Sequence, residues 1–451
     1  MRASFAFLSI GSLWLGALGA ACNGQVVAPA SAPSDAGASS VEAGSATDAA
    51  TTAVEAGPVD PGPPRCTKPR PASPQDDDAG APDAGGDAGY FARHPWPTVV
   101  RQGGPVLASP HLVPIVFDGD PFADDLDRFT ASVGCTDYYR ATVNEYGVGD
   151  AIAGALTRLD EPSPSRITSE EIERWLVREL TQKSPRIERP AKDALYIIYY
   201  GPGTEVEQGP GVLSCQAFGG YHTNVVLPDG TPVAYAVVPR CDGMGDSTLD
   251  TTTSAASHEI VEAVTDPYNK ENPAFAYVDD AHASWMFVLG GEVSDLCAQR
   301  SDADYTPEGY PYAVQRSWSN RAARRGEDPC VPASGEKLFT AAFTLPDTVD
   351  LGDGFFGRGV VVPAGESRTL DLELHDEGAG AMLVDVTDAS SMLGHAGHST
   401  LTLDRTSGKS GDVLKLTIKA PAGFSSEPEL FTVALSKGGR YTYADVGAIG
   451  H

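Results

Sequence analysis

The segment SHEIVEAVTDP, residues 257–267, contains the side chains of this chain that are best suited to chemistry. His258 and Glu262 are four residues apart, so on a helix they project from the same face. An imidazole and a carboxylate placed in this way can bind one divalent ion. Glu259, next to His258, would then lie beside the open coordination position, where it can take a proton from bound water. The spacing therefore predicts a metal site with Glu259 as a general base.

Two more carboxylates follow in GGEVSDLC, residues 290–297. Glu292 and Asp295 lie 34 and 37 residues past His258. A catalytic zinc ion needs a third protein ligand, and here a later segment of the chain offers two candidates. We therefore expect Glu292, Asp295 or both to complete the metal site of His258 and Glu262.

The spacing of His258 and Glu262 resembles the HExxH helix of zincin metallopeptidases, with Glu262 in place of the second histidine. Carboxylates are also zinc ligands, so this replacement does not abolish the site. It lowers the positive charge that a bound water feels, because an anionic ligand replaces a neutral one. Zinc is the first choice of ion, and manganese, iron and calcium are the alternatives.

Two further residues have roles that the sequence leaves open. His222, in GGYHTN, is interpreted as a catalytic donor that polarises a substrate carbonyl, as a further ligand, or as a histidine packed at a strand end. Asp266 comes eight residues after His258 and directly before Pro267. That position fits a helix end or a partner of a metal ligand better than a ligand itself.

The elements that must position these side chains can be read from periodicity. Pro267 stops the helix that carries His258, and Thr168 with Glu171 forms a capping box at the start of another helix. Strands interleaved with helices on a mixed sheet predict an α/β or α+β core. The expected elements are a strand over 111–119, helices over 168–183 and 250–266, a central strand over 194–203 and a hairpin over 224–238.

The pairing of HEIVEAVTDP with EVSDLC resembles the EXORDIUM, or phosphate-induced, proteins of plants and their secreted bacterial relatives. In that family a HELxE helix, ended by an asparagine- or aspartate-proline pair, precedes an EIGDLC segment. Val293 and Ser294 stand where the family has isoleucine and glycine. The resemblance covers about residues 95–332. It implies a zincin-like metal-binding core more firmly than it implies catalysis.

The last part of the chain, residues 333–451, follows the expected metal-binding core of residues 91–332 and has a different pattern. Short segments of alternating apolar and polar residues are separated by glycine-rich turns, and none has a helical period. The clearest segments are 367–376, 381–388, 398–405, 413–421 and 430–436. This pattern predicts an all-β, immunoglobulin-like sandwich.

Six cysteines remain when Cys22 is set aside, and an even number favours disulfides in an exported protein. One expected bridge would fix the turn that carries the later carboxylates, and a second would bracket the hairpin. The third follows by elimination. The expected pairs are Cys297–Cys330, Cys215–Cys241 and Cys66–Cys135.

Residues 1–22 form an export signal, because Arg2 precedes an apolar run that is too short to span a bilayer. The ending LGAAC resembles a bacterial lipobox, which would make Cys22 the acylated N-terminus of the mature protein. Ordinary cleavage nearby is the alternative. Residues 23–90 are almost all alanine, glycine, proline, serine, threonine and aspartate, so we expect a disordered tether.

The chain has 61 acidic and 32 basic residues and a formal net charge of −29. A surface of this charge repels nucleic acid and anionic lipid, so we expect membrane contact only through an N-terminal lipid anchor. The sequence favours an exported monomer, secreted or held at the outer membrane or cell surface, that hydrolyses peptide bonds or a cell-surface polymer. The alternative is a non-catalytic surface protein for binding or signalling, in which the metal site is structural and closed by protein ligands.

Overall fold

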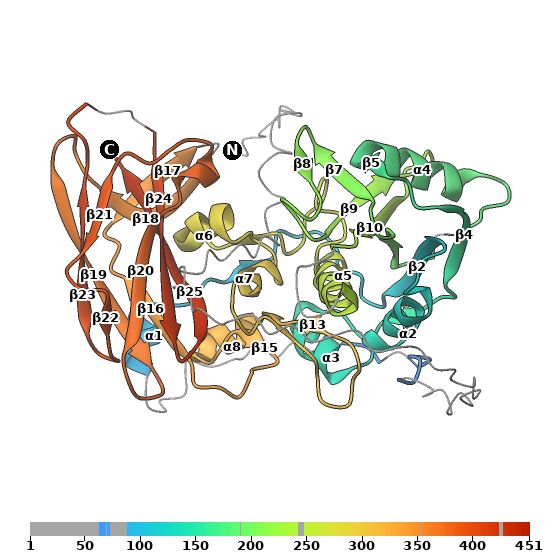
Figure 1. The fold of residues 1–451 in the computed structure, drawn as a ribbon, viewed down its shortest axis with the longest axis horizontal. Helices are drawn as coiled ribbons and strands as arrows, with labels where there is room; N and C mark the ends of the chain where they lie inside the picture. The colour runs from blue at the N-terminus through green and yellow to red at the C-terminus, as the bar shows by residue number, and fades with distance from the viewer. Residues whose placement is uncertain are drawn as a thin grey trace, which may run out of the picture.

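An α/β part and a β-sandwich lie side by side along the longest axis of the molecule (Figure 1). The computed structural model describes residues 63–68, 70–72, 88–189, 191–241, 248–352, 354–423 and 427–451. The expected export signal, Cys22 and most of the expected tether lie outside these residues. At this level the predicted class, mixed α/β with an added β-sandwich, is confirmed.

The sheet that carries the site has the strand order β3-β2-β6-β10-β9, and β4 also pairs with β2. All its neighbours are parallel except β9, an edge strand that runs antiparallel to β10. The apolar run around residues 194–199 forms β6 at the centre, buried throughout, as predicted. The strands are β2 (His111–Asp118), β3 (Ile152–Ala153), β4 (Thr157–Pro162), β6 (Ala194–Tyr199), β9 (Tyr221–Val226) and β10 (Pro232–Val238).

Helices cover both faces of this sheet. On one face α4 (Ser169–Thr181) packs Ile172, Leu176 and Leu180 against the strands, and the predicted capping box of Thr168 and Glu171 is present. The other face is covered by α2 (Ala123–Val133), α3 (Asp137–Val143) and α5 (Thr248–Thr265). The helix predicted over 250–266 is α5, and it lies across the middle of the α/β part in Figure 1.

The remaining elements of the α/β part are short. They connect the sheet to the sandwich and carry the second group of carboxylates. The helices are α1 (Ala88–Arg93), η1 (Asn144–Tyr146), η2 (Asp280–His282), α6 (Ala283–Val288), α7 (Asp295–Ala298) and α8 (Asn320–Arg325). The paired strands are β1 (Val99–Val100) with β11 (Tyr277–Val278), β12 (Asp304–Tyr305) with β13 (Val314–Gln315), β14 (Ser317–Trp318) with β15 (Cys330–Val331), and β7 (Glu205–Gly209) with β5 (Arg166–Thr168) and β8 (Val212–Leu213).

The sandwich consists of two sheets with one apolar core between them. One sheet has the order β16 (Phe339–Phe343), β19 (Ser367–Asp376), β23 (Val413–Lys419), β21 (Thr400–Leu403). The other has the order β17 (Asp347–Gly352), β18 (Phe355–Val361), β25 (Arg440–Gly450), β24 (Glu429–Lys437), β20 (Met382–Asp388), β22 (Ser407–Gly408), and η3 (Ser390–Leu393) follows β20. The predicted β-sandwich is therefore present, as one sheet of four strands and one of six.

The expectation of a disordered tether over residues 23–90 is wrong for the parts that the structure describes. The backbone of Cys66 donates a hydrogen bond to α2 at 2.8 Å, and Arg70 accepts one from Asp150 at 2.7 Å. Farther along, Tyr90 of α1 stacks on His375 of the sandwich, with ring centroids 4.7 Å apart. Average composition predicts no core for such a segment, but a disulfide and one aromatic side chain are enough to hold it locally.

Three disulfides hold the described chain together, and all three predicted pairs are confirmed. They join Cys66 to Cys135, Cys215 to Cys241, and Cys297 to Cys330. Disulfides of this kind are typical of proteins exported from the reducing cytosol. Among the described residues, no helix has the length and apolar character needed to cross a bilayer.

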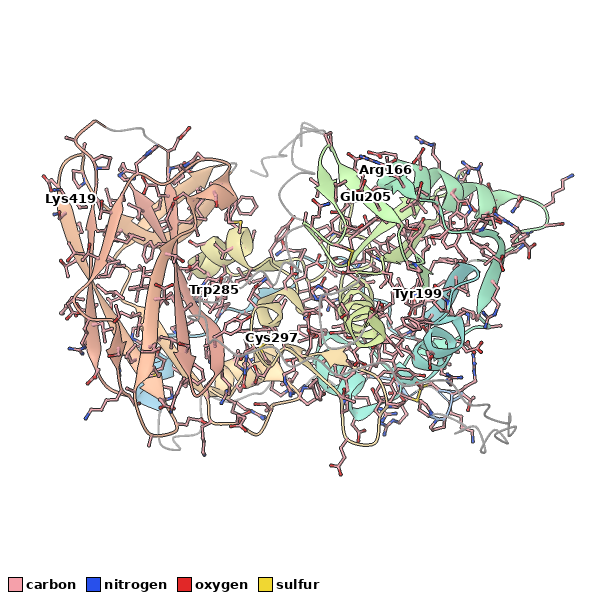
Figure 2. All side chains as sticks on the ribbon, viewed as in Figure 1. Arg166, Tyr199, Glu205, Trp285, Cys297 and Lys419 are labelled. Carbon is pink, nitrogen blue, oxygen red and sulfur yellow. A yellow bond between two sulfur atoms is a disulfide. The ribbon has the colours of Figure 1, made fainter. Side chains whose placement is uncertain are left out.

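The two parts of the molecule meet around Trp285, which lies between them in Figure 2. This side chain is buried, and its ring is 6.5 Å from that of Trp318, edge to face. Cys297 lies nearer the α/β part in the same view, on α7. The short helices from α6 to α8 are therefore held between the sandwich and the sheet, which gives the late carboxylates a rigid support.

Candidate metal centre

Helix α5 presents His258 and Glu262 side by side, with Nε2 of the imidazole 3.0 Å from Oε2 of the carboxylate. Both residues are buried: His258 is 1% exposed and Glu262 is 4% exposed. On its other side, the imidazole Nδ1 lies 3.1 Å from Oε1 of Gln315. The amide of Gln315 donates from Nε2 to the carbonyl of Ser294 at 2.9 Å, which turns its oxygen towards Nδ1. In the neutral ring Nδ1 therefore carries the hydrogen, and the Nε2 lone pair faces Glu262.

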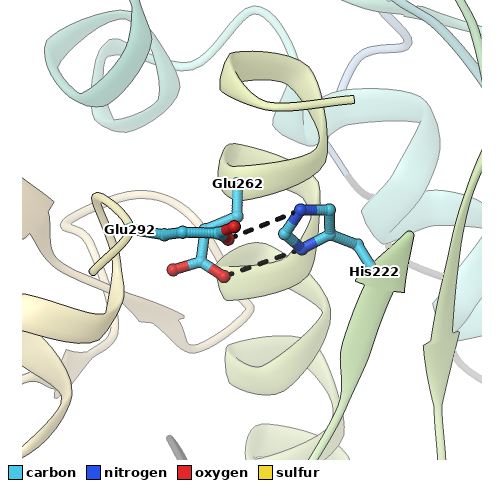
Figure 3. A group of neighbouring side chains, drawn as sticks. All are labelled: His222, Glu262 and Glu292. Atoms are coloured by element: carbon cyan, nitrogen blue, oxygen red, sulfur yellow. Dashed lines mark ion pairs between the residues drawn. The ribbon is translucent and has the colours of Figure 1, made fainter. Parts of the chain in front are cut away.

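Strand β9 brings His222 to the same place from the edge of the sheet. His222 pairs with Ala236 of β10, whose side chain lies in the core beneath α5, so the imidazole also points towards α5. Its Nδ1 is 3.5 Å from Oε2 of Glu259 and 3.7 Å from Oε2 of Glu262. Its Nε2 is 3.4 Å from Oε2 of Glu292. Figure 3 shows both the Glu262 and the Glu292 carboxylates on one side of the His222 ring, with a dashed line from each to one ring nitrogen.

The segment after α6 supplies the last two carboxylates. Gly290 has φ of +96°, and a Cβ there would lie 2.1 Å from Oδ2 of Asp295, so both backbone and space require glycine. The same Oδ2 accepts a hydrogen bond from the backbone of Glu292 at 3.4 Å. Oδ1 of Asp295 lies 3.6 Å from Nε2 of His258. The turn thus directs Glu292 towards one histidine and Asp295 towards the other.

Glu262 is the centre of the arrangement. Its Oε1 accepts hydrogen bonds from the backbone N–H groups of Ser294 and Asp295, both at 3.1 Å. Its Oε2 faces both histidines. The backbone of Ser294 makes this bond, so a serine in place of the family's glycine leaves the link between α5 and α7 intact. Glu262 is therefore fixed by one oxygen and offers the other to the site.

The predicted general base, Glu259, is packed against a glycine. A Cβ built on Gly220 would lie 2.7 Å from Oε1 and 2.8 Å from Cγ of Glu259. The φ angle of Gly220 does not require glycine, so the reason for this residue is space. Glu259 is 2% exposed, and its Oε2 faces His222 of β9.

Five carboxylates crowd this region, and no lysine or arginine forms an ion pair with any of them in the part of the chain that is described. They belong to Glu259, Glu262, Asp266, Glu292 and Asp295. Asp266 also closes the end of α5, because its Oδ1 accepts from the backbone of Ala274 at 2.5 Å. Buried anions without counter-charges are costly, so the cluster must hold either protons or a cation.

The three carboxylates at the periphery of the cluster have raised pKa values. Burial and the charges of Glu262, Asp266 and Asp295 raise the pKa of Glu292 well above its ordinary value. Burial and the charge of Glu262 do the same to the pKa of Asp295. Burial raises the pKa of Asp266 as well, although the hydrogen bond from Ala274 opposes it. Without a cation, these three groups therefore hold their protons to a higher pH than exposed carboxyl groups do.

The two groups at the centre, Glu262 and His222, have pKa shifts that favour their charged forms. Burial would raise the pKa of Glu262, but the charge and hydrogen bond of His258 outweigh it, and the pKa is lowered. Burial would lower the pKa of His222, but the hydrogen bond to Glu259 and the charges of Glu262 and Glu259 raise it above its ordinary value. Without a metal ion, Glu262 is therefore an anion beside protonated imidazoles. A bound ion would take the place of the proton on Nε2 of His258, and the neutral tautomer set by Gln315 applies to that state.

Neither a family model nor a curated protein matches this chain. Among solved structures, the surface layer protein SbsC, domains 1–6, matches 26% of the chain and 13% of its own length at 13% identity, with a TM-score of 0.17. A chimeric titin Z1Z2 functionalized with a KLER exogenous peptide from decorin matches 24% of the chain and 46% of its own length at 17% identity, with a TM-score of 0.15. The chain spans less than half of either protein. Similarities this small carry no inference about fold or function.

All six predicted side chains lie together in the structure. They are His222, His258, Glu259, Glu262, Glu292 and Asp295. Their ligand atoms form two groups that share one member, with Glu262 and Glu292 beside His222, and Glu259 and Glu262 beside His258. The position of His222 beside two carboxylates fits a metal ligand as well as a catalytic donor.

The sequence did not single out Gln315 or Gly220. A lone glutamine 57 residues from His258 carries no motif, and its role appears only when β13 packs against α5. Gly220 stands in a GG pair that reads as a turn. The nearest signal was its place two residues before His222.

Proposed function

We propose that this chain is an exported, divalent-metal-dependent hydrolase of the metallopeptidase type, with a zincin-like core. The observation that carries the proposal is the convergence of two histidines and four carboxylates from β9, α5 and the 290–297 segment. Among the described residues, no lysine or arginine forms an ion pair with these carboxylates. The resemblance of residues 95–332 to the EXORDIUM family is part of the same proposal.

The donor set fits a transition metal. His258 and Glu262 with Asp295, and His222 and Glu262 with Glu292, each offer one nitrogen and two oxygens. Mixed sets of this kind suit zinc, manganese and iron. Calcium prefers six to eight oxygens, so two imidazoles make it the poorest match of the four. A bound ion would lower the pKa of a bound water and polarise a scissile carbonyl.

Glu259 is the residue proposed to move the proton. It lies on α5 next to His258, and its Oε2 is 3.5 Å from Nδ1 of His222. The carboxylate would accept a proton from the attacking water and then deliver it to the leaving amine. His222 keeps this carboxylate oriented, and Gly220 leaves it the space.

The test compares two glutamates that are three residues apart. Glu259→Gln is expected to retain the metal and to lose at least about 100-fold in turnover, as removal of a general base usually does. Glu262→Gln is expected to lose both metal and activity. Glu188→Gln is the matched control, because Glu188 forms a histidine–carboxylate pair with His111 at 2.8 Å on the surface. Metal content and cleavage of a broad peptide library are measured. Unchanged turnover in Glu259→Gln would contradict the proposal.

A structural metal site is the second candidate, and burial is the observation that favours it. His258, Glu259 and Glu262 are almost completely buried, and the Glu292 side chain is 16% exposed. A structural site is closed by its protein ligands, whereas a catalytic site keeps a position open. Cobalt substitution separates the two candidates. A hydroxamate that changes the visible spectrum of the cobalt protein indicates an open position, and an unchanged spectrum indicates a closed one.

Export is supported by the three disulfides. Anchoring through Cys22 is part of our proposal. A lipid anchor followed by a long tether would place the folded domains away from the membrane surface. Mass spectrometry of the mature N-terminus tests it, since an acylated Cys22 is expected and an unmodified N-terminus would contradict it.

A further inference from the structure

The ligand atoms of the candidate metal centre divide into two half-sites. In the first half-site, Nε2 of His222 faces Oε2 of Glu292 at 3.4 Å. In the second, Nε2 of His258 faces Oδ1 of Asp295 at 3.6 Å. Glu262 belongs to both, because its Oε2 lies 3.7 Å from Nδ1 of His222 and 3.0 Å from Nε2 of His258. One carboxylate oxygen of Glu262 thus lies near both histidines, whereas Glu292 and Asp295 each face one of them.

Each half-site contains a buried polar atom that has no hydrogen bond. In the first it is Nε2 of His222, and in the second it is Oδ1 of Asp295. Both residues are 7% exposed, so water cannot approach freely from bulk solvent. An unsatisfied buried polar atom costs about 1–3 kcal/mol, and native proteins rarely leave two in one place. Each half-site therefore contains one buried atom that lacks a hydrogen-bond partner.

The two histidines are oriented independently. His258 is fixed by Gln315 on one side, which directs its Nε2 lone pair to Glu262 and Asp295. His222 comes from a different element, β9, and its position is fixed by the register of that strand against β10. Metal-binding histidines are usually held in this way by a group on their other nitrogen or by their backbone. The two imidazoles thus approach the cluster from different elements, and each faces a different carboxylate of the 290–297 segment.

The number of possible ligands also exceeds what one ion needs. Glu259, Glu262, Glu292 and Asp295 each have an oxygen within 3.7 Å of a histidine nitrogen, and no described lysine or arginine pairs with them. A catalytic zinc ion uses three protein ligands, so four carboxylates and two imidazoles are enough for two ions.

We propose that the centre binds two divalent ions bridged by Oε2 of Glu262, one with His222 and Glu292 and the other with His258 and Asp295. This inference rests on the proposed function, since it takes the same cluster as the metal site. Carboxylate-rich sets with one imidazole per ion suit manganese, iron or zinc. Two-metal sites hold their ions about 3.5–4 Å apart and stabilise both the attacking and the leaving oxygen of a hydrolysed bond.

The first test is the number of ions bound. The whole chain is stripped of metal, loaded with Mn²⁺ or Zn²⁺ alone, dialysed and analysed by mass spectrometry and titration calorimetry. Two ions per chain are expected. One ion per chain would overturn this inference and leave the proposed function standing. No bound ion would overturn both. The wild-type protein decides this result, so it does not depend on the folding of any variant.

The second test assigns each ion to its half-site. Glu292→Gln and Asp295→Asn are each expected to lower the content from two ions to one, whereas Glu188→Gln keeps two. Electron paramagnetic resonance of the Mn²⁺ protein gives a readout that loss of stability does not mimic. Wild type is expected to show an exchange-coupled spectrum, and each single variant the spectrum of an isolated ion. An isolated-ion spectrum in fully loaded wild type would overturn the bridge, and circular dichroism checks that the variants fold.

Discussion

Gln315 and His258 are 57 residues apart in the sequence, yet Oε1 of the amide lies 3.1 Å from Nδ1 of the imidazole. Because the amide nitrogen of Gln315 is used by the Ser294 carbonyl, its oxygen is the only part that can face the ring. In the neutral ring this contact selects the tautomer whose Nε2 carries the lone pair that a cation would bind. Gln315 is not itself a proposed ligand, but it determines which nitrogen of His258 can bind an ion.

Replacing Gln315 by leucine is expected to weaken metal binding roughly 10- to 100-fold, the usual effect of removing the group that orients a metal-binding histidine. Gln315→Glu still offers an oxygen to Nδ1 and is expected to recover part of this loss. Competition with a chromophoric chelator measures the affinity, and circular dichroism checks the fold. Equal affinity in wild type and Gln315→Leu would show that the contact has no part in binding.

Gly220→Ala should separate metal binding from turnover. The new Cβ would come within 2.7 Å of Oε1 of Glu259, so the general base has to move while the ligands on α5 and the 290–297 segment do not. We expect the metal content to be unchanged and the turnover to fall by at least about 10-fold, because misplacing a catalytic group by about 1 Å is costly. Gly209→Ala is the control, since no atom lies within 4 Å of a Cβ at that position. Full activity in Gly220→Ala would contradict the role of Glu259.

Much of the fold could be predicted because its signals are local. The capping box of Thr168 and Glu171 marks the start of α4 within one residue, and the continuous apolar run marks β6 as the central strand. Helix α5 was recognisable from Pro267, which ends it. Each of these features depends on residues a few positions apart, and periodicity reports such features well.

The site was predictable only in part, because some of its contacts join residues that are far apart in the sequence. His258 and Glu262 are related by helix spacing, but Gln315 reaches them only through tertiary packing. The sharing of Glu262 between two histidines depends on the register of β9, which no local pattern gives. The tether prediction failed where Cys66 and Tyr90 anchor short segments, because average composition does not register single contacts.

The buried carboxyl group of Asp445 is expected to make the unfolding free energy depend on pH, independently of the candidate metal centre. Burial raises its pKa, although backbone N–H groups of Phe343 and Val446 donate to it at 2.8 Å. The folded state therefore binds this proton more tightly than the unfolded state, so the contribution of Asp445 to stability falls as the pH rises above about 4, the ordinary value for aspartate. The unfolding free energy of wild type minus that of Asp445→Asn should accordingly decrease from pH 4 to pH 8. Urea unfolding of both proteins measures it, and a difference that rises with pH would contradict the assignment.

The disulfide between Cys297 and Cys330 is expected to affect the metal site, unlike the one between Cys66 and Cys135. The first bridge is two residues past Asp295, and it fixes the end of the segment that carries two proposed ligands. Replacing both of its cysteines by serine should lower stability by about 2–4 kcal/mol and weaken metal binding as well, because the carboxylate turn is no longer held in place.

The Cys66–Cys135 bridge supplies the control for that experiment. It closes a longer loop, with a sequence separation of 69 against 33, so its removal should cost at least as much stability. It lies at α2 and the start of α3, and we expect no change in metal affinity when it is removed. Thermal unfolding and chelator competition are measured on both double variants below their melting temperatures. If the two variants lose metal affinity equally, the loss reflects general destabilisation, and the bridge at Cys297 has no special role in holding Glu292 and Asp295.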